Sequence, residues 1–297
     1  MMKWYGFFDM HTQTSGRNLR QKYYALTVTA LIFGGVGIAV LARSGAATPF
    51  VALEPENGIL TAGTTVLSDT TASAGKSLRF GASSSPQPLG VPGTWNIRFQ
   101  DEFNGTTLDT SKWTTLDGWS MNNVTTHTAN VSVSGGSAIL TLASSTSGAE
   151  ICSCNSANYT LPVGGYAEAR VYFPGTSTQL YNWPAWWVSG PNWPAAGEHD
   201  IAEVLSGEMT VNYHSAGPAS RNHGVVPGVW QNAYHVYGVH RKASSADVYY
   251  DGKLVKSYPT DDNGAGQHLI VNVGRGGGPT VYGSASQIKV DYVRTWH

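Results

Sequence analysis

The sequence predicts an all-β fold: a two-sheet antiparallel β-sandwich of the jelly-roll type with a concave cleft. From about Thr94 to His297, short runs of β-forming residues alternate with turn signals rich in Gly and Pro, such as SGG, LPVGG and GGGP. No long helical period interrupts these runs. Regular strands without crossover helices are typical of antiparallel sandwiches and jelly rolls.

Composition narrows the classes of partner. The chain has 297 residues, of which 12% are charged, and a net charge of -1. A nucleic-acid partner would require a basic stripe, which the sequence lacks, and nothing in the charge favours a polyanionic substrate. With 10 tryptophans and 35 glycines, the chain suits neutral sugars, which are held by hydrogen bonds to hydroxyls and by aromatic faces.

The N-terminus has the parts of an export signal. Residues 1–22 carry four basic residues and one acidic residue, residues 25–42 carry no charge, and small residues follow Arg43. We therefore expect residues 1–47 to be a signal peptide, cleaved near Ala46 or Ala47, and the protein to be secreted or extracellular. The apolar run is also near the length of a membrane span, so an uncleaved anchor helix over residues 25–42 is the alternative.

Two further segments precede the main domain. Residues 48–81 are a short β-rich stretch that resembles the opening strands of a family 35 or family 6 carbohydrate-binding module. The stretch is too short to be a whole module, so no binding residues are carried over. Residues 82–93, ASSSPQPLGVPG, are predicted to be a linker, and the main domain spans residues 94–297.

The two cysteines, Cys152 and Cys154, are separated by one residue. On a strand they would point to the same face, and they are too close for an ordinary cross-link across the fold. We expect two packed or partly exposed thiols. A redox or metal pair is the alternative, although no His or Cys cluster lies nearby in the sequence.

An acidic cluster is the main chemical signal. Glu198, Asp200 and Glu203 lie within six positions of the segment GEHDIAEVL, which reads as a strand. Three neighbouring carboxylates repel each other, and no basic residue in the segment offsets the repulsion. The alternative to a functional role is a solvated face that happens to be acidic.

Strand geometry makes the cluster more specific. Side chains alternate along a strand, so Glu198 and Asp200 share a face and Glu203 would point to the opposite one. A one-residue β-bulge at Ile201–Ala202 would bring Glu203 back beside the other two. Their carboxyl groups could then approach to roughly 5–5.5 Å, the separation that a double-displacement glycosidase needs. Asp200, between them, would tune both pKa values.

The sequence resembles glycoside hydrolase family 16, the laminarinase-like enzymes with a concanavalin-type jelly roll. The resemblance covers about residues 95–297. It rests on FQDEFNGTTLDTSKW at 99–113, GGYAEARVYFPG at 164–175, NWPAWW at 182–187, NWPAAGEHDIAEVL at 192–205 and VDYVRTW at 290–296.

The resemblance implies roles for the acidic residues. Glu198 matches the family's nucleophile, Asp200 the assisting acid and Glu203 the general acid/base. The spacing is the bulged form, which is less like the lichenase-like and xyloglucan-acting members. The resemblance as a whole implies a retaining endo-hydrolase of a neutral β-linked polysaccharide, with β-1,3-glucan as the expected substrate. No cofactor is expected for catalysis, and the protein is expected to be a monomer.

Substrate contacts are also implied. Trp193 matches the tryptophan that floors the cleft, and His214 matches a cleft histidine. Further candidates are Trp183, Trp187 and, more weakly, Asn123 and Asn130. Each could instead be a core residue, and one of Trp186 and Trp187 must be, because neighbours on a strand face opposite ways. The chain departs from the family at His240, where a subsite tryptophan is usual, which puts the precise substrate in doubt.

A structural calcium ion is a further implication of the resemblance. Glu102 and Asp291 match positions that contribute to a Ca2+ site on the convex side of family members, and hard oxygen ligands suit such a site. The alternative is that both acids bond to turns or neighbouring residues.

Two other functions remain open on the sequence. A non-catalytic lectin could share the fold, although it would not need the three acids. A transglycosylase would use the same covalent intermediate and differ only in the acceptor.

Overall fold

The computed structural model describes residues 64–68, 76–80, 85–155 and 159–297, and it divides the chain into two compact units, residues 1–83 and 84–297. In the first unit, β1 (Thr64–Ser68) and β2 (Lys76–Phe80) form an antiparallel pair. The predicted signal or anchor helix in residues 1–47 lies outside the described residues. Within those that are described, no helix is long and apolar enough to cross a membrane.

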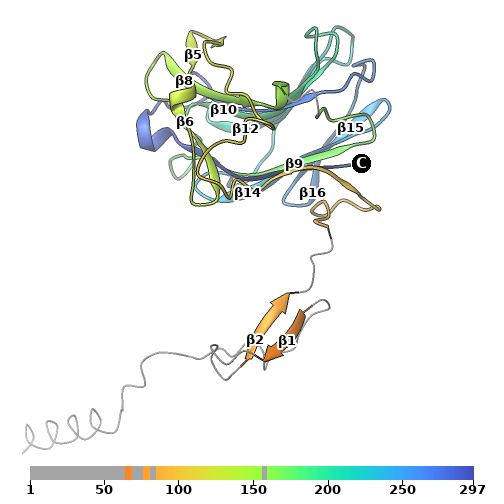
Figure 1. Ribbon diagram of the computed structural model, residues 1–297. Coiled ribbons are helices and arrows are strands. Elements are labelled where there is room, and N and C mark those ends of the chain that lie inside the picture. The colour runs from red at the N-terminus through yellow and green to blue at the C-terminus, as the bar shows by residue number, and fades with distance from the viewer. Residues whose placement is uncertain (1–63, 69–75, 81–84, 156–158) are drawn as a thin grey trace, which may run out of the picture. The chain divides into compact units, whose positions relative to one another are not determined.

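The second unit is a sandwich of two stacked sheets (Figure 1), as predicted. The first sheet contains, in spatial order, β13 (Arg221–Val225), β12 (Glu208–His214), β11 (Glu198–Leu205), β10 (Trp183–Ser189), β17 (His268–Gly274), β8 (Ser147–Cys152), β5 (Val124–Thr126) and β4 (Ser120–Met121). Neighbouring strands are antiparallel except β5 and β8.

The second sheet lies against the first. It contains β16 (Lys253–Pro259), β15 (Ser245–Tyr250), β14 (Tyr234–Arg241), β9 (Tyr166–Tyr172), β18 (Ile288–Trp296), β7 (Ser137–Leu140) and β6 (Val131–Ser134), with β3 (Ile97–Asp101) also paired to β18. The helical elements in the described part of this unit are short 3-10 turns: η3 (Thr128–Asn130), η4 (Ser153–Asn155) and η5 (Gly283–Ser286).

Alternation along the strands builds the core between the sheets. On β10, Trp186 and Val188 are fully buried against Tyr237 and Val239 of β14. Each such side chain contributes about 1.5–3 kcal/mol of hydrophobic stabilisation. The alternate residues of β10, Trp183, Ala185 and Trp187, face the other way, onto the concave side of the first sheet. This alternation places them in the site described below.

The cysteines differ from the expectation, because Cys152 and Cys154 form a disulfide. The prediction of free thiols assumed a continuing strand, but β8 ends at Cys152 and the chain turns into η4. The turn brings the two Cα atoms to 5.1 Å, which is within the range for a disulfide.

Residues 85–93 of the predicted linker pack on the second unit. The indole Nε1 of Trp296 donates to the carbonyl of Pro86, and the backbone N–H of Leu89 donates to Glu168. Val91 is buried with Tyr166 and Trp296 in a small apolar cluster. This part of the predicted linker therefore adds to the folded unit.

Candidate active site

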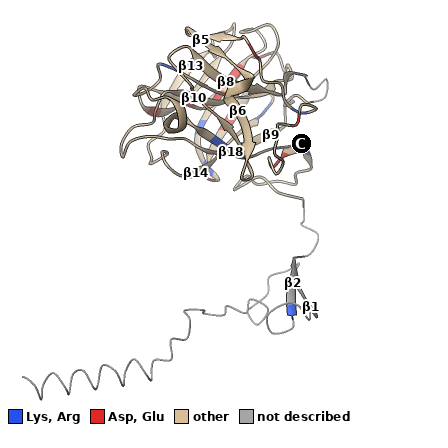
Figure 2. Cartoon of the chain, turned by 60° about the vertical axis from the view of Figure 1, so that its left-hand side comes forward, with Lys and Arg blue, Asp and Glu red and all other residues tan. Residues whose placement is uncertain are grey.

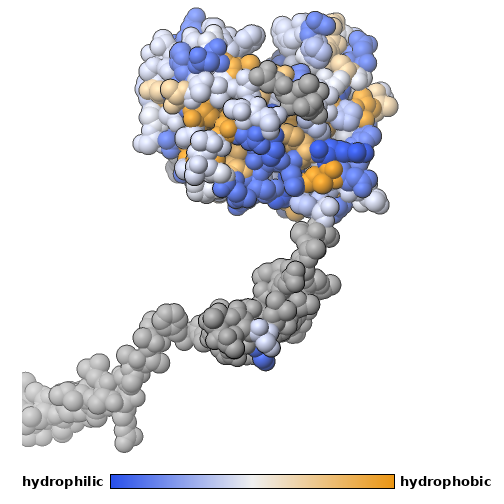
Figure 3. Space-filling model, viewed as in Figure 1, coloured by the Kyte–Doolittle hydropathy of each residue, from blue (hydrophilic) through white to orange (hydrophobic). Residues whose placement is uncertain are grey.

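A cavity of about 200 Å3 lies on the concave side of the first sheet, and the surface in this region is hollowed between two lobes at the top of Figure 3. The lining residues come from β4, β8, β10, β11, β12 and β17 and from the residue just before β4. They are Trp119, Met121, Glu150, Trp183, Ala185, Trp187, Glu198, Asp200, Glu203, His214 and Asn272. All three acids of the predicted cluster are among them.

The β-bulge predicted at Ile201–Ala202 is confirmed. On β10, Ala185 and Trp187 are two residues apart and share a face, yet their partners on β11 are Glu203 and Asp200, which are three apart. The pairing of β11 with β12 shifts at the same place. Ile201 and Ala202 are both fully buried in the core, so the extra residue turns Glu203 back to the concave face.

Hydrogen bonds from neighbouring strands hold the bulge. The hydroxyl of Tyr250, from the second sheet, donates to the carbonyl of Ile201 at 2.8 Å. The hydroxyl of Thr210 on β12 donates to the carbonyl of Glu203 at 2.9 Å. These bonds give partners to backbone carbonyls where the ladder is interrupted.

Glu203 has two side-chain donors. Its Oε1 accepts from the indole Nε1 of Trp183 at 2.8 Å, and its Oε2 accepts from the Nδ2 of Asn212 at 2.5 Å. Trp183 comes from β10 and Asn212 from β12. The carboxyl group is therefore held from both flanking strands.

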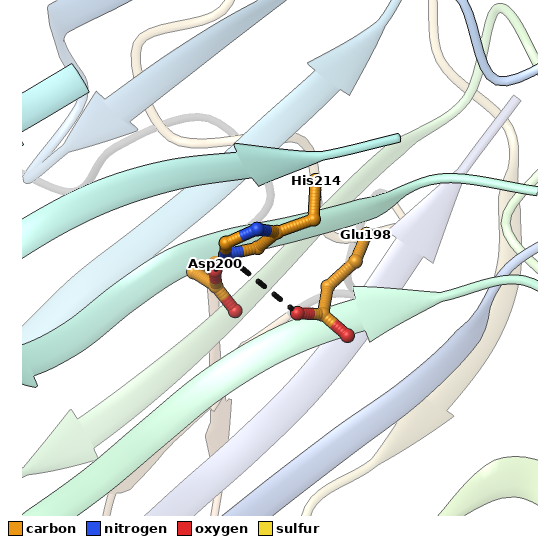
Figure 4. A group of neighbouring side chains, drawn as sticks. All are labelled: Glu198, Asp200 and His214. Atoms are coloured by element: carbon orange, nitrogen blue, oxygen red, sulfur yellow. Dashed lines mark ion pairs between the residues drawn. The ribbon is translucent and has the colours of Figure 1, made fainter. Parts of the chain in front are cut away.

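His214 pairs with the other two acids. Its Nε2 lies 3.2 Å from Asp200 Oδ2 and 4.0 Å from Glu198 Oε1 (Figure 4). The bond to Asp200 raises the pKa of the imidazole. The sequence proposed His214 for substrate contact, and the structure places it beside the acids, where its charge offsets part of their repulsion.

Burial and mutual repulsion shift the acids in the same direction. Burial and then the charge of Asp200 raise the pKa of Glu198 to about 8. The same causes raise the pKa of Glu203 to about 7, against the opposing effect of its bonds to Trp183 and Asn212. Charged residues are sparse over the whole unit (Figure 2), so three acids in one cavity are unusual for this protein. Because the pKa values of Glu198 and Glu203 are raised, the cluster retains at least one proton at neutral pH rather than carrying three charges.

The predicted aromatic contacts divide into two groups. Trp183 and Trp187 line the cavity, and Trp187 donates to Oδ1 of Asn272. Trp186, their neighbour, is the core residue of the pair, as strand alternation required. Trp193 is 61% exposed in the loop before β11 and does not line the cavity.

The two predicted asparagines have local backbone roles. Asn123 is exposed in the two-residue turn between β4 and β5, with a φ of 64°, a conformation that asparagine tolerates well. Asn130 donates to Ser147 and to the carbonyl of Gly148. Neither lines the cavity.

His240 lies away from the cavity. His240 belongs to β14 in the second sheet, where its ring makes an edge contact with Trp95 at 5.1 Å. It does not line the cavity on the first sheet. The substitution of histidine for tryptophan therefore carries no information about the substrate subsites in this cavity.

Sequence reasoning missed six residues in and beside the cavity. Glu150 and Asn272 lie in one row across the sheet with Ala185 and Glu203, through the pairings of β8, β17, β10 and β11. Trp119, Met121 and Asn212 complete the set. The order of the strands in the sheet brings these residues into one row although they are far apart in the sequence. No local sequence motif predicts such a row.

Residues 119–294, more than half of the chain, match the model of the glycosyl hydrolases family 16. The chain belongs to this family. Its curated relative glucan endo-1,3-beta-glucosidase A1 of Niallia circulans is 27% identical over 259 residues, which cover 68% of this chain but only 38% of the relative.

Solved structures of family 16 enzymes share the fold. A non-specific endo-β-1,3(4)-glucanase superposes with a TM-score of 0.58 at 22% identity, over 71% of this chain and 94% of that one. The laminarinase of Rhodothermus marinus superposes with a TM-score of 0.57 at 23% identity, over 69% and 98% of the two chains.

Glu102 and Asp291, for which the resemblance implied a calcium site, each form an ion pair with an arginine. Both oxygens of Glu102 accept from Arg294 at 2.7 Å, and Asp291 accepts from Arg170 at 2.8 Å. Each carboxylate thus already has a cationic partner within the protein. These side chains do not fit a calcium site, and we place no ion there. In the described residues, the group of side chains close enough to share an ion is Glu198, Asp200 and His214, to which we assign acid–base roles below.

Proposed function

We propose that this member of family 16 is a retaining endo-hydrolase of a neutral β-linked polysaccharide, with β-1,3-glucan as its substrate. The observation that carries the proposal is the bulge in β11, which gathers Glu198, Asp200 and Glu203 on the floor of one cavity. The activity in the name of the Niallia circulans relative supports the choice of glucan.

The chemistry proceeds by double displacement. The carboxylate of Glu198 attacks the anomeric carbon while Glu203 gives its proton to the leaving oxygen, so the glycosidic bond breaks and a glycosyl-enzyme ester forms. Glu203, now a carboxylate, takes a proton from water, and the water oxygen attacks the same carbon and releases Glu198. Two inversions give net retention of configuration.

Asp200 and His214 support this exchange. With pKa values raised to about 8 for Glu198 and about 7 for Glu203, the two carboxyl groups share protons near neutral pH rather than both ionising. Asp200 repels a second charge on either glutamate, and its bond to His214 limits its own repulsion. Near neutral pH the pair then holds about one proton, and the first step uses the arrangement in which Glu203 carries it and Glu198 is ionised, the less populated of the two in the free protein.

The lining of the cavity supports a neutral substrate. It contains no lysine or arginine, and four of its residues are carboxylic acids: Glu150, Glu198, Asp200 and Glu203. A sulfated or uronic-acid polymer would be repelled. The indole rings of Trp183 and Trp187 offer flat apolar surfaces for the C–H faces of pyranose rings.

We also propose that the protein acts outside the cell, either secreted or held by an N-terminal anchor, on the basis of the basic, apolar and small-residue pattern predicted to be an export signal in residues 1–47.

A panel of laminarin, curdlan, lichenan, agarose and xyloglucan, with products sized by chromatography and their first-formed anomer read by NMR, tests the proposal. We expect laminarin to be cut within the chain, with the β-anomer formed first. Formation of the α-anomer would exclude double displacement. Binding without cleavage would indicate the lectin, and products longer than the substrate would indicate a transglycosylase.

A further inference from the structure

Next to the lining of the cavity, an asparagine for which the sequence suggested no role contacts Glu203. Asn212 lies on β12, only 2% exposed, and is paired in register with Asp200 on β11. The next paired residues are Glu203 and Thr210, because Ile201 and Ala202 together occupy the place of one residue. The bulge therefore brings the side chain of Glu203 beside that of Asn212.

The contacts of Asn212 are directed at the carboxyl group. Its Nδ2 is 2.5 Å from Glu203 Oε2 and 3.3 Å from the hydroxyl of Thr210. On the other side of the carboxyl group, the Nε1 of Trp183 is 2.8 Å from Oε1. Each of the two carboxyl oxygens thus receives one hydrogen bond and keeps lone-pair capacity for a further contact.

The chemistry of these donors restricts where the proton of Glu203 can go. An amide N–H and an indole N–H donate but do not accept, so neither Asn212 nor Trp183 can take that proton. Proton exchange with Glu203 is then left to the groups on the cavity side of the carboxyl: the substrate oxygen, a water molecule or the neighbouring ionisable residues. The two donors also fix the rotation of the carboxyl plane, which lies between β10 and β12.

We propose that Asn212 is a positioning residue for Glu203, holding its carboxyl group in the orientation from which it gives a proton to the leaving oxygen and later takes one from water. The inference rests on the proposed function, since it assigns a partner to the acid/base of that reaction. Thr210 supports the same arrangement, because it bonds to the backbone carbonyl of Glu203.

A change in proton affinity follows from this contact. Hydrogen bonds from Asn212 and Trp183 favour the ionised carboxyl, whereas burial and the charge of Asp200 favour the neutral one. The other ionisable groups facing Glu203 are Glu198 on the same strand, His214 on β12, Glu150 on β8 and Tyr250 on β15. Removing the Asn212 donor leaves these unchanged and raises the pKa of Glu203.

The test compares Asn212→Ala and Asn212→Leu with Asn272→Ala in the full-length protein. Leucine is close to asparagine in size and shape, so Asn212→Leu fills the site while it removes the donor and adds no charge. Asn272 is a matched control: it is a buried asparagine, 4% exposed, on the same face of the sheet, but it bonds to Trp187 and Met121 and not to the acids.

Two readouts separate positioning from folding. The first is the pH profile of kcat/KM on laminarin. We expect both Asn212 variants to lower kcat/KM by about 10- to 100-fold and to move the alkaline limb to higher pH. The second is a 13C NMR titration of the Glu203 carboxyl group, which requires no activity. In both Asn212 variants it should show titration at higher pH than in the wild type, and in Asn272→Ala it should not.

The outcomes are distinct. An upward shift of the Glu203 titration in both Asn212 variants, absent in Asn272→Ala, supports the positioning role. Titration of Glu203 at the wild-type pH in the folded Asn212→Leu variant overturns it, whatever happens to the rate. If the wild type cleaves no glycan but the titration shifts, the contact stands and the proposed function fails.

Discussion

The pKa of Glu150 is shifted by a single cause, its burial. This residue lies on the cavity floor, 3% exposed, and burial alone raises the pKa of its carboxyl group from 4.5 to about 7. In the unfolded chain it loses its proton at lower pH than in the fold. Between about pH 4.5 and 7 the unfolded state therefore gains stability relative to the folded one as the pH rises.

Glu150→Gln removes this effect and should stabilise the protein at alkaline pH. We expect its free energy of unfolding to match that of the wild type near pH 4 and to exceed it by about 2–3 kcal/mol at pH 8. Urea unfolding at several pH values measures the difference. Glu208→Gln, at an exposed position on β12, is the control and should show little change. A difference that is constant with pH would show that the ionisation of Glu150 is not coupled to folding.

The two glutamates to which we assign the chemistry should each be essential for turnover. Glu198→Ala and Glu203→Ala should each lower kcat by several orders of magnitude, because each removes a group required in a different bond-making step. Azide should restore activity to Glu198→Ala with inversion of configuration, since a small anion then replaces the nucleophile. Near-normal turnover of Glu198→Ala without azide would refute its assignment.

The bulge in β11 is the structural element on which the site depends. It was predictable because residue parity and the face of burial are both encoded locally: two acids share one face, and the third needs an extra residue to join them. The hydroxyl of Tyr250, which bonds to the carbonyl of Ile201, was not predictable, since it comes from the opposite sheet.

Tyr250→Phe should destabilise the bulge. The carbonyl of Ile201 would be left buried without its partner, at a cost of about 1–3 kcal/mol, and activity should fall as the acids lose register. Tyr237→Phe is a matched control, because Tyr237 is also fully buried, its ring lies 4.7 Å from that of Tyr250, and its hydroxyl has no partner among the described residues. Thermal unfolding and kcat measured for both variants test this; equal effects of the two substitutions would contradict the role of the bond.

The hairpin of β4 and β5 shows why other site residues were missed. In the order of the sheet, β4 is three positions from β17, which corresponds to about 14 Å in a flat sheet. Yet the sulfur of Met121 lies 3.3 Å from Nδ2 of Asn272, and Asn122 donates to the carbonyl of Arg275. The hairpin therefore folds back over the concave side and brings Trp119 and Met121 to the cavity. The sequence patterns predicted an all-β fold but neither this hairpin nor its return over the sheet.

At the scale of the whole molecule, the second unit begins before the domain predicted from the sequence. A chain truncated to residues 84–297 should unfold at the same temperature as this unit does in the full-length protein. A chain starting at residue 94 should be less stable by several kcal/mol, because it loses the burial of Val91 and the bonds to Trp296 and Glu168. Calorimetry of the two truncated chains decides this, and equal stabilities would show that residues 85–93 are only a tether.

Fold class and the acidic cluster were readable from the sequence because both depend on short-range periodicity. The disulfide, the second-sheet position of His240 and the cavity row from Glu150 to Glu203 were not, because each depends on where a strand ends or which strands are neighbours. These are consequences of packing two whole sheets together, and a local pattern does not contain them.

The central claim is that one bulged strand carries both the nucleophile and the acid/base of a retaining hydrolase. A 2-deoxy-2-fluoro glycoside of the preferred glucan, with a reactive leaving group, should trap the glycosyl-enzyme, because fluorine slows both steps while the leaving group speeds the first. Mass spectrometry of the digested protein then locates the sugar. We predict one sugar chain esterified to Glu198; a label on Glu203, or on a residue outside β11, would contradict the account.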